Sequence, residues 1–382
     1  VKVIDFYRES FQCLECRKQE HFSIEKPQMP QPVLAKSIAS PSSVAHVIAQ
    51  KYQFSMPLYR QEQEWKSIGI ALSRATLANW VIRSAEDWLM PLVDCMHAEL
   101  LKQPVIHADE TPVQVLNEKG RKNKTKSYMW VYTNGEFVQD GRQIRIYEYH
   151  PGRNGGFAGK FLEGYEGILQ TDGYAGYEQI SCKEHALCWV HARRYFVDAI
   201  PAGISQEEAA ESISGQAIRK INEIFALDKD LSHKSAEERQ AERLRLEKDK
   251  LEAFFVWLEG IQPKTLPKST LGKAVNYALN HRKGLSAFLT DGNIALSNNI
   301  CERAIRNFTI GRKNWLFSAS PKGAAASAAV YSIVETSKAN GLEPFRYLTC
   351  LFENLPNLNF KIHPELLEKF LPWSDEIQKN CK

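Results

Sequence analysis

The spacing of hydrophobic residues divides the chain into helical and extended stretches. Between residues 42 and 101, apolar side chains recur at every third or fourth position, which predicts amphipathic helices. Between residues 105 and 172, the apolar runs become short, β-branched or aromatic, and are bounded by Gly, Asn and Lys, as is typical of strands. From residue 205 to 290 the helical spacing returns, and no strand signal interrupts it.

The extended region contains four predicted strands, at residues 105–109, 128–132, 144–149 and 167–172. A short helical pattern separates the last two strands. Three consecutive strands, a helix and a fourth strand predict a mixed sheet flanked by helices. Because a ribonuclease H-like core has this order of elements, we expect an α/β fold with that core, an all-helical insertion and an N-terminal helical domain.

A helix-turn-helix pattern occupies residues 67–81. Gly69 allows the turn, and Ser73 can cap the second helix. A helical hairpin that serves only packing would show the same pattern, so both interpretations stay open. In the DNA-binding interpretation, the second helix buries Leu77, Trp80 and Val81 and turns Arg74, Thr76 and Asn79 toward DNA.

Apolar residues of the region 205–290 recur on helical faces and predict an insertion made only of helices. Helical character returns at residues 298–306 and again at 324–340, where Gly341 follows in the manner of a C-cap. The residues on the apolar faces of the insertion are Ile218, Ile221, Ile224, Phe225, Leu244, Leu251, Phe255 and Leu258.

Composition narrows the class of protein only slightly. The 382 residues carry 49 basic and 45 acidic side chains, and the net charge of +4 does not by itself indicate a nucleic-acid partner. No apolar stretch approaches the roughly 18 residues of a membrane span, and no signal-peptide pattern opens the chain. The chain begins at Val1 rather than Met, which suggests that an N-terminal part is missing. A basic cluster that could contact phosphates or form a solvated loop comprises Lys119, Arg121, Lys122, Lys124 and Lys126.

The eight cysteines include one Cys-x-x-Cys pair, Cys13 and Cys16, and the others are scattered. This usage indicates reduced thiols in a cytosolic protein. Two cysteines at that spacing can supply half of a tetrahedral zinc site, with His21 as a third candidate ligand. Two thiols without a metal role remain the alternative.

Two aspartates follow predicted strands. Asp109 closes one apolar run, and Asp172 closes another and precedes Gly173, which leaves room beside the carboxylate. Neighbouring strands would aim both acids at one point, where like charges repel unless a cation lies between them. Glu302, near the start of an amphipathic helix, is the best third ligand. Each acid alone would be a surface carboxylate or helix cap, but together they predict an oxygen-rich site for two magnesium or manganese ions.

The blocks around these acids resemble a known family. HADETPVQV around Asp109, LQTDGYAGY around Asp172 and LSNNICERAIRNFTIGRKNWLF around Glu302 are similar to the three signature blocks of the insertion-sequence-66 family transposases of the TnpC type. The resemblance extends over residues 1–355 and implies a bacterial DDE transposase whose metal-binding triad is formed by these three acids. Ser297 stands where some relatives have Asp, outside the triad.

The resemblance also bears on two cysteine motifs. The Cys-x-x-Cys pair looks like the second half of the family's zinc-binding module, whose first half would precede Val1. Cys188 and His191 form a Cys-x-x-His motif similar to one in several groups of DDE transposases, with His185 nearby. A metal role is one interpretation of this motif, and a buried thiol with a hydrogen-bonded imidazole is the other.

Basic residues follow Glu302 and could grip phosphates near the scissile bond. Salt bridges to the helical insertion are the alternative use of these side chains. The residues concerned are Arg303, Arg306, Arg312 and Lys313.

The expected organisation has six segments: a partial zinc-binding module and Pro-rich linker (1–40), a helical DNA-binding domain (41–101), the first part of the ribonuclease H-like catalytic core (102–204), the helical insertion (205–290), the second part of the core with the Glu302 helix (291–355) and a C-terminal tail (356–382).

The expected activity is metal-dependent cleavage of double-stranded DNA at transposon ends, followed by strand transfer into target DNA. Two other functions stay open: a structure-specific nuclease of the same fold, and a DNA-binding accessory protein without catalysis. The resemblance further implies a homodimer or larger oligomer on DNA, accessory proteins of the element, and a location in the bacterial cytoplasm at the nucleoid.

Overall fold

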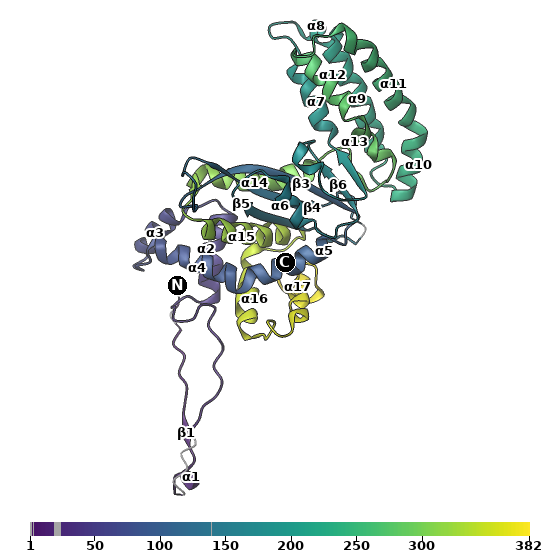
Figure 1. Ribbon diagram of the computed structural model, residues 1–382. Coiled ribbons are helices and arrows are strands. Elements are labelled where there is room, and N and C mark those ends of the chain that lie inside the picture. The colour runs from purple at the N-terminus through teal and green to yellow at the C-terminus, as the bar shows by residue number, and fades with distance from the viewer. Residues whose placement is uncertain (1, 3, 19–23, 139) are drawn as a thin grey trace.

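The computed structural model describes residues 2, 4–18, 24–138 and 140–382 (Figure 1). Its N-terminal part projects from the body as a long arm that ends in a two-stranded antiparallel sheet of β1 (Phe11–Gln12) and β2 (Ile24–Glu25). The short helix α1 (Leu14–Lys18) lies between these strands. His21, the third candidate zinc ligand, lies outside the described residues.

The predicted N-terminal helices are present as α2 (Pro41–Tyr52), α3 (Leu58–Ser67), α4 (Arg74–Ser84) and α5 (Met90–Leu100), with a π-helical turn (Ala85–Leu89) between the last two. The predicted turn between two helices is present, between α3 and α4. Gly69 turns the chain with φ +86°, and Ser73 Oγ accepts a hydrogen bond from the Thr76 N–H at 3.1 Å. As predicted, α4 buries Leu77, Trp80 and Val81.

The sheet at the centre of the body has the spatial order β5-β4-β3-β6-β7. β3 (Val105–Val115), β4 (Lys126–Asn134) and β5 (Arg145–His150) form an antiparallel meander. β6 (Ile168–Thr171) runs parallel to β3, and β7 (Glu184–Leu187) runs parallel to β6. The short β8 (Phe317–Ser318) pairs with the end of β3. The four predicted strands and the helix between the last two, α6 (Gly155–Phe161), are confirmed, whereas β7 and β8 were not predicted.

The prediction that Asp109 ends its strand is wrong. β3 continues to Val115, because it pairs with β4 along its whole second half. On its other edge, β3 pairs with β6 only from Val105 to His107. Asp109 therefore lies inside a strand, at the point where the neighbouring strand β6 has ended.

Two long helices return to this sheet after the insertion. α14 (Asn299–Trp315) packs against β3 and β4, and α15 (Pro321–Ala339) packs along the edge strand β5. Ser332 Oγ accepts a hydrogen bond from the Tyr147 N–H at 2.8 Å, so a side chain of α15 pairs part of that edge. α15 ends one residue before Asn340, and Gly341 follows with φ +75°, as the C-cap pattern predicts.

The insertion is entirely helical, as predicted, and forms a second hydrophobic core at one end of the sheet (Figure 1). The preceding helix α7 (Trp189–Asp198) packs into it. The expectation that Leu244 belongs to the buried face is wrong, because this side chain is 45% exposed. The helices are α8 (Gln206–Glu211), α9 (Ile213–Asp230), α10 (Ala236–Leu246), α11 (Lys248–Ile261), α12 (Thr270–Asn280) and α13 (Arg282–Ser286).

The C-terminal residues pack onto the helices below the sheet through α16 (Pro344–Asn354) and α17 (Asp375–Asn380). Leu367, Leu371 and Ile377 are buried in the main core. Among the residues that the structure describes, no helix combines the length and apolar character that crossing a bilayer requires. The remaining elements are short 3-10 turns at Ala175–Tyr177, Gln262–Lys264, Ala287–Leu289, Leu355–Asn357 and Pro364–Phe370.

Candidate active site

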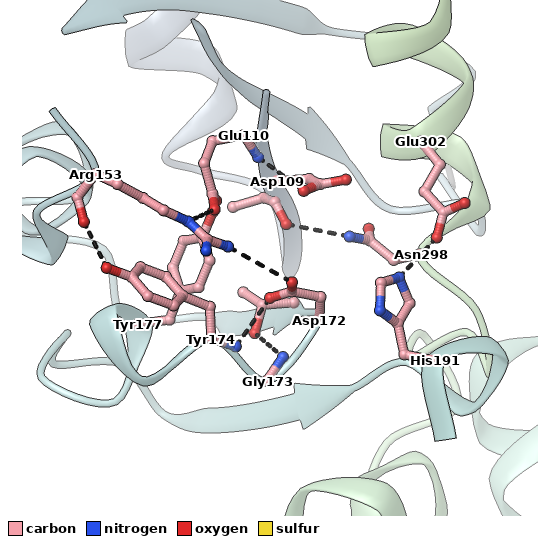
Figure 2. Close-up of polar contacts among 12 residues, drawn as sticks. Asp109, Glu110, Arg153, Asp172, Gly173, Tyr174, Tyr177, His191, Asn298 and Glu302 are labelled. Carbon is pink, nitrogen blue, oxygen red and sulfur yellow. Dashed lines mark hydrogen bonds and ion pairs between the residues drawn. The ribbon is translucent and has the colours of Figure 1, made fainter. Parts of the chain in front are cut away.

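Asp109 and Asp172 meet because of the register between β3 and β6. The parallel pairing aligns Val105 with Ile168 and His107 with Gln170. Continued by two residues, this register brings Asp109 opposite Asp172, with both side chains on the same face of the sheet. The two carboxylates interact electrostatically, as expected for like charges that share one site. Figure 2 shows both acids in one cluster.

The carboxyl group of Asp109 is held in an unfavourable environment for a negative charge. Burial, followed by the neighbouring charges of Glu110 and Asp172, raises its pKa to about 7, against smaller opposing effects of the Glu110 N–H and of His191. Its Oδ1 accepts a hydrogen bond from the Glu110 N–H at 2.8 Å. A cation bound beside Asp109 would relieve the repulsion and the cost of burial.

Asp172 lies directly after β6, as predicted. Its Oδ1 accepts a hydrogen bond from the Tyr174 N–H at 2.9 Å, which fixes the turn that begins at Gly173 with φ +86°. Its Oδ2 lies 4.0 Å from an Arg153 guanidinium nitrogen. The Tyr277 hydroxyl donates to the backbone carbonyl of Asp172 at 2.8 Å, so the insertion also contacts this segment.

Glu302 lies in the first turn of α14, and its carboxylate faces α7 (Figure 2). His191 Nε2 donates a hydrogen bond to Glu302 Oε1 at 2.9 Å, and Arg194 Nη2 lies 3.9 Å from Oε2. The hydrogen bond from His191 lowers the pKa of Glu302, against the opposing effect of burial. His191 also interacts electrostatically with Asp109, so this imidazole is near both the first and the third acid of the predicted triad.

Asn298 joins the segment before α14 to β3 and α7. Its side-chain amide donates to the Ala108 carbonyl at 3.1 Å, and its Oδ1 accepts from His107 Nδ1 at 2.8 Å. Its backbone N–H donates to Cys188 Sγ at 3.1 Å. The sequence pattern places residue 298 at the start of a helix, but the side chain of Asn298 makes no capping bond to α14. Because Asn298 is polar and yet fully buried, its hydrogen bonds are part of the structure that holds these segments together.

The Cys-x-x-His motif has features of both interpretations, the structural one and the metal-binding one. Cys188 is a buried thiol, and His191 is a hydrogen-bonded imidazole. One ligand atom each from Cys188, His191 and Glu302 lie within 4.8 Å of one another. His185, by contrast, contacts the Ile180 carbonyl at 2.9 Å and is not part of this cluster.

A second polar cluster, missed by the sequence analysis, supports the acids from the other side. Arg153 Nε donates to Glu110 Oε1, and the Tyr177 hydroxyl donates to Glu110 Oε2 at 2.6 Å (Figure 2). The Arg153 guanidinium also lies 3.9 Å from the centre of the Tyr174 ring. Because Glu110 follows Asp109 on the strand, this cluster orients β3 and brings Arg153 near Asp172.

The basic residues of α14 differ in their surroundings. Arg303, Arg306 and Lys313 are exposed, and within the described chain none of them forms an ion pair with the insertion. Arg312 instead bonds to β3, through Thr111 Oγ1 at 3.1 Å and the Pro112 carbonyl. Arg312 also borders a groove of about 370 Å³ whose other lining residues are Pro112, Val113, Gln114, Lys124, Thr125 and Lys126.

The remaining predicted contact residues lie away from the acids. On α4, Arg74 and Asn79 are exposed and Thr76 is partly exposed. On the N-terminal arm, Cys13 is exposed and Cys16 partly exposed, and both thiols are free. The hydrogen bonding between these two cysteines lowers the pKa of Cys13 and raises that of Cys16.

The donor set of the central cluster fits divalent magnesium or manganese. Its donors are carboxylate oxygens, and Asp109 has a raised pKa without a cationic side chain in hydrogen-bond contact. Asp109 and Asp172 could hold an ion between them, whereas the carboxylate of Glu302 contacts His191 and Arg194.

Comparison with known proteins identifies the family of this chain. Residues 36–326 match the family described as Transposase IS66 family, and residues 332–373 match the IS66 C-terminal element. An uncharacterized protein of Sinorhizobium fredii, y4jD, is 30% identical over 370 residues, which cover 94% of this chain and 70% of that protein. Two others, y4hP and y4qI, are 29% and 31% identical, over 97% and 87% of this chain and 68% and 62% of their own lengths. The chain therefore belongs to the IS66 family of transposases.

Proposed function

We propose that this protein cleaves DNA at transposon ends and joins the freed strand to target DNA, with Asp109, Asp172 and Glu302 as the metal-binding triad. The observation that carries the proposal is the parallel register of β3 and β6, which brings Asp109 opposite Asp172, the residue directly after β6, next to the helix that carries Glu302. Family membership supports the same activity.

The strand order supports a ribonuclease H-like core. In chain order, the five main strands lie in the sheet as third, second, first, fourth and fifth, and only the second is antiparallel to its neighbours on both sides. The first strand, β3, is central. It carries the first acid, and the fourth strand, β6, leads directly to the second.

In the proposed reaction, the residues of this chain have distinct roles. Asp109 and Asp172 hold the divalent ions, which supply activation of the attacking oxygen and stabilisation of the leaving oxygen when bound. His191 keeps Glu302 oriented through its hydrogen bond. Cleavage by water and strand transfer by a 3′-hydroxyl are both in-line displacements at phosphorus, so one site serves both.

DNA contacts are proposed on two surfaces. Arg303, Arg306 and Lys313 on α14 lead away from Glu302 and can bind phosphates, and Arg312 extends this path toward the β3–β4 hairpin. α4 of the helix-turn-helix would contact duplex DNA through Arg74, Thr76 and Asn79. Cutting at two transposon ends makes a dimer or larger assembly on DNA part of the proposal, and a zinc ion at Cys13 and Cys16 a further part.

The test of catalysis compares Asp109→Asn, Asp172→Asn and Glu302→Gln with Glu178→Gln, which changes an exposed carboxylate in the turn after Asp172. The substrate is a plasmid that carries both ends of the element encoding this chain, incubated with Mn²⁺. Each triad variant should bind the ends and fail to cut, whereas the control cuts normally. Normal cutting by any triad variant would overturn the assignment. Cutting without joining would instead identify a nuclease.

Metal binding is measured separately, by unfolding the metal-free protein with and without Mn²⁺. An ion that binds only the folded state should stabilise the wild type by about 2.7 kcal/mol at 100 times its dissociation constant. Asp109→Asn should abolish this stabilisation. The same substitution should stabilise the metal-free protein near neutral pH, since the neutral amide avoids the burial of a charge and its repulsion by Glu110 and Asp172, which together raise the pKa of Asp109. An equal Mn²⁺ effect in both proteins would favour a non-catalytic accessory protein.

A further inference from the structure

A pair of stacked aromatic rings borders the acid cluster on the side of the insertion. The ring of Tyr195, on α7, is 42% exposed and stacks on the ring of Tyr277, on α12, with centroids 4.5 Å apart and an interplanar angle of 27°. Tyr277 also contacts the His281 ring at 4.6 Å. Tyr277 is anchored to the site, because its hydroxyl donates to the Asp172 carbonyl at 2.8 Å.

A second connection links the exposed ring to the third acid. Tyr195 follows His191 by four residues on α7, so the two side chains lie about one helical turn apart on the same face. His191 donates its hydrogen bond to Glu302, and Arg194 lies 3.9 Å from the same carboxylate. Tyr195 thus stands between the segment that holds Asp172 and the side chain that orients Glu302.

Packing into the hydrophobic core of the insertion does not explain why Tyr195 is held where it is. The buried side chains of α7 are Trp189, Ala192 and Phe196, which pack into the insertion. Tyr195 instead keeps a large part of its ring in solvent while the Tyr277 ring limits its rotation. A rigid exposed aromatic ring binds a planar ligand with little further loss of conformational entropy.

We propose that Tyr195 stacks one unpaired nucleobase of the DNA strand whose phosphate lies at Asp109 and Asp172. The Tyr277 ring covers one face of the Tyr195 ring, and the exposed part of Tyr195 is left for the ligand. Bases inside a duplex are already stacked on both sides, and only a base that has left the helix can use such a face. Aromatic stacking accepts any base, and the exposed Arg194 beside it suits the adjoining phosphate. This inference rests on the proposed function.

The test measures base stacking without catalysis. The full-length protein is titrated, in the absence of divalent metal, into a short oligothymidylate that carries a single 2-aminopurine, and into a duplex with the same base paired. Stacking should quench the fluorescence of the single strand. Tyr195→Ala should weaken single-strand binding by about 5- to 150-fold and leave duplex binding unchanged, while Tyr195→Trp should restore it. Val197→Ala, at another exposed position of α7, is the matched control.

The outcomes separate this inference from the proposed function. Single-strand affinity and quenching in Tyr195→Ala equal to those of the wild type would overturn base stacking, whatever the cleavage assay gives. Equal weakening for single strand and duplex would also overturn it, since the ring would then not distinguish unpaired bases. If instead the triad variants cut DNA normally while Tyr195→Ala loses the single strand, the proposed catalysis fails and the stacking site stands. Urea unfolding of each variant excludes a loss of fold.

Discussion

The side-chain amide of Asn298 donates a hydrogen bond, 3.1 Å long, to the carbonyl oxygen of Ala108, the residue that precedes Asp109. The same side chain accepts from His107, and its backbone N–H donates to Cys188. Asn298 is fully buried and immediately precedes α14. These bonds determine where the Glu302 helix begins relative to the strand that carries Asp109.

Replacing Asn298 should therefore affect both stability and catalysis. Asn298→Ala leaves the Ala108 carbonyl and the His107 N–H without their partner, and each unsatisfied buried group costs about 1–3 kcal/mol. We expect a lower free energy of unfolding in urea, and a fall in the rate of cleavage that exceeds the fall in DNA affinity. Asn299→Ala, one residue later and only partly buried, is the control. Equal stability of the two variants would contradict the prediction.

This contact also illustrates what the sequence could and could not predict. The helical period of α4 reflects local geometry, so the burial of Leu77, Trp80 and Val81 was predicted correctly. The partner of Asn298 lies 190 residues earlier, and no local pattern reveals such a contact. Asp109 was placed at a strand end because the apolar run stops there, whereas the pairing with β4 extends the strand.

Other differences have similar causes. β7 was missed because Glu184–Leu187 is four residues long and contains no β-branched side chain. Leu244 was assigned to a buried face because the spacing allows it, but α10 directs two arginines, Arg239 and Arg243, inward instead. These arginines donate hydrogen bonds to backbone carbonyls of the segment after α13, including those of Gly292 and Phe288. Such tertiary contacts cannot be read from the local spacing of apolar residues.

The DNA-binding interpretation of α3 and α4 predicts an effect of Arg74 on duplex binding. Arg74 is exposed at the first position of α4, where its backbone N–H donates to Glu62 Oε1 at 3.0 Å. If its side chain binds a phosphate, Arg74→Ala should weaken duplex binding and reduce the salt dependence of log K by about one, without a change in unfolding. Titrations of a duplex at several salt concentrations measure this slope. Lys229→Ala, at an exposed site on the insertion, serves for comparison. Unchanged binding by Arg74→Ala would favour a hairpin used for packing.

The insertion contains a buried charge arrangement with a consequence for pH stability. Arg243 Nε donates to Asp228 Oδ1 at 2.7 Å, and Glu247 lies beside this pair, fully buried, with neither carboxylate oxygen hydrogen-bonded within the described chain. One guanidinium thus faces two acids. Burial, reinforced by Asp228 and opposed by Arg243, raises the pKa of Glu247 from 4.5 to about 8.

Glu247 should therefore make the protein less stable at alkaline pH. In the unfolded chain Glu247 loses its proton above its ordinary pKa, whereas the folded chain keeps the proton until about pH 8. Its contribution to stability is complete below pH 4.5 and disappears as the pH rises through 8. Urea unfolding between about pH 6 and about pH 9 should show a decline that Glu247→Gln reduces, by an amount on the order of 2–4 kcal/mol at the alkaline end.

Two comparisons isolate the effect of Glu247. Asp109 also has a raised pKa, so part of the decline should persist in Glu247→Gln, and the difference between the two curves is the quantity to measure. Glu242→Gln changes a carboxylate on α10, the helix that ends just before Glu247. Glu242 is paired with Arg245 at the surface, and the curve of this variant should follow that of the wild type. If Glu247→Gln unfolds with the wild-type pH dependence, Glu247 is ionised in the folded insertion and Arg243 balances both acids.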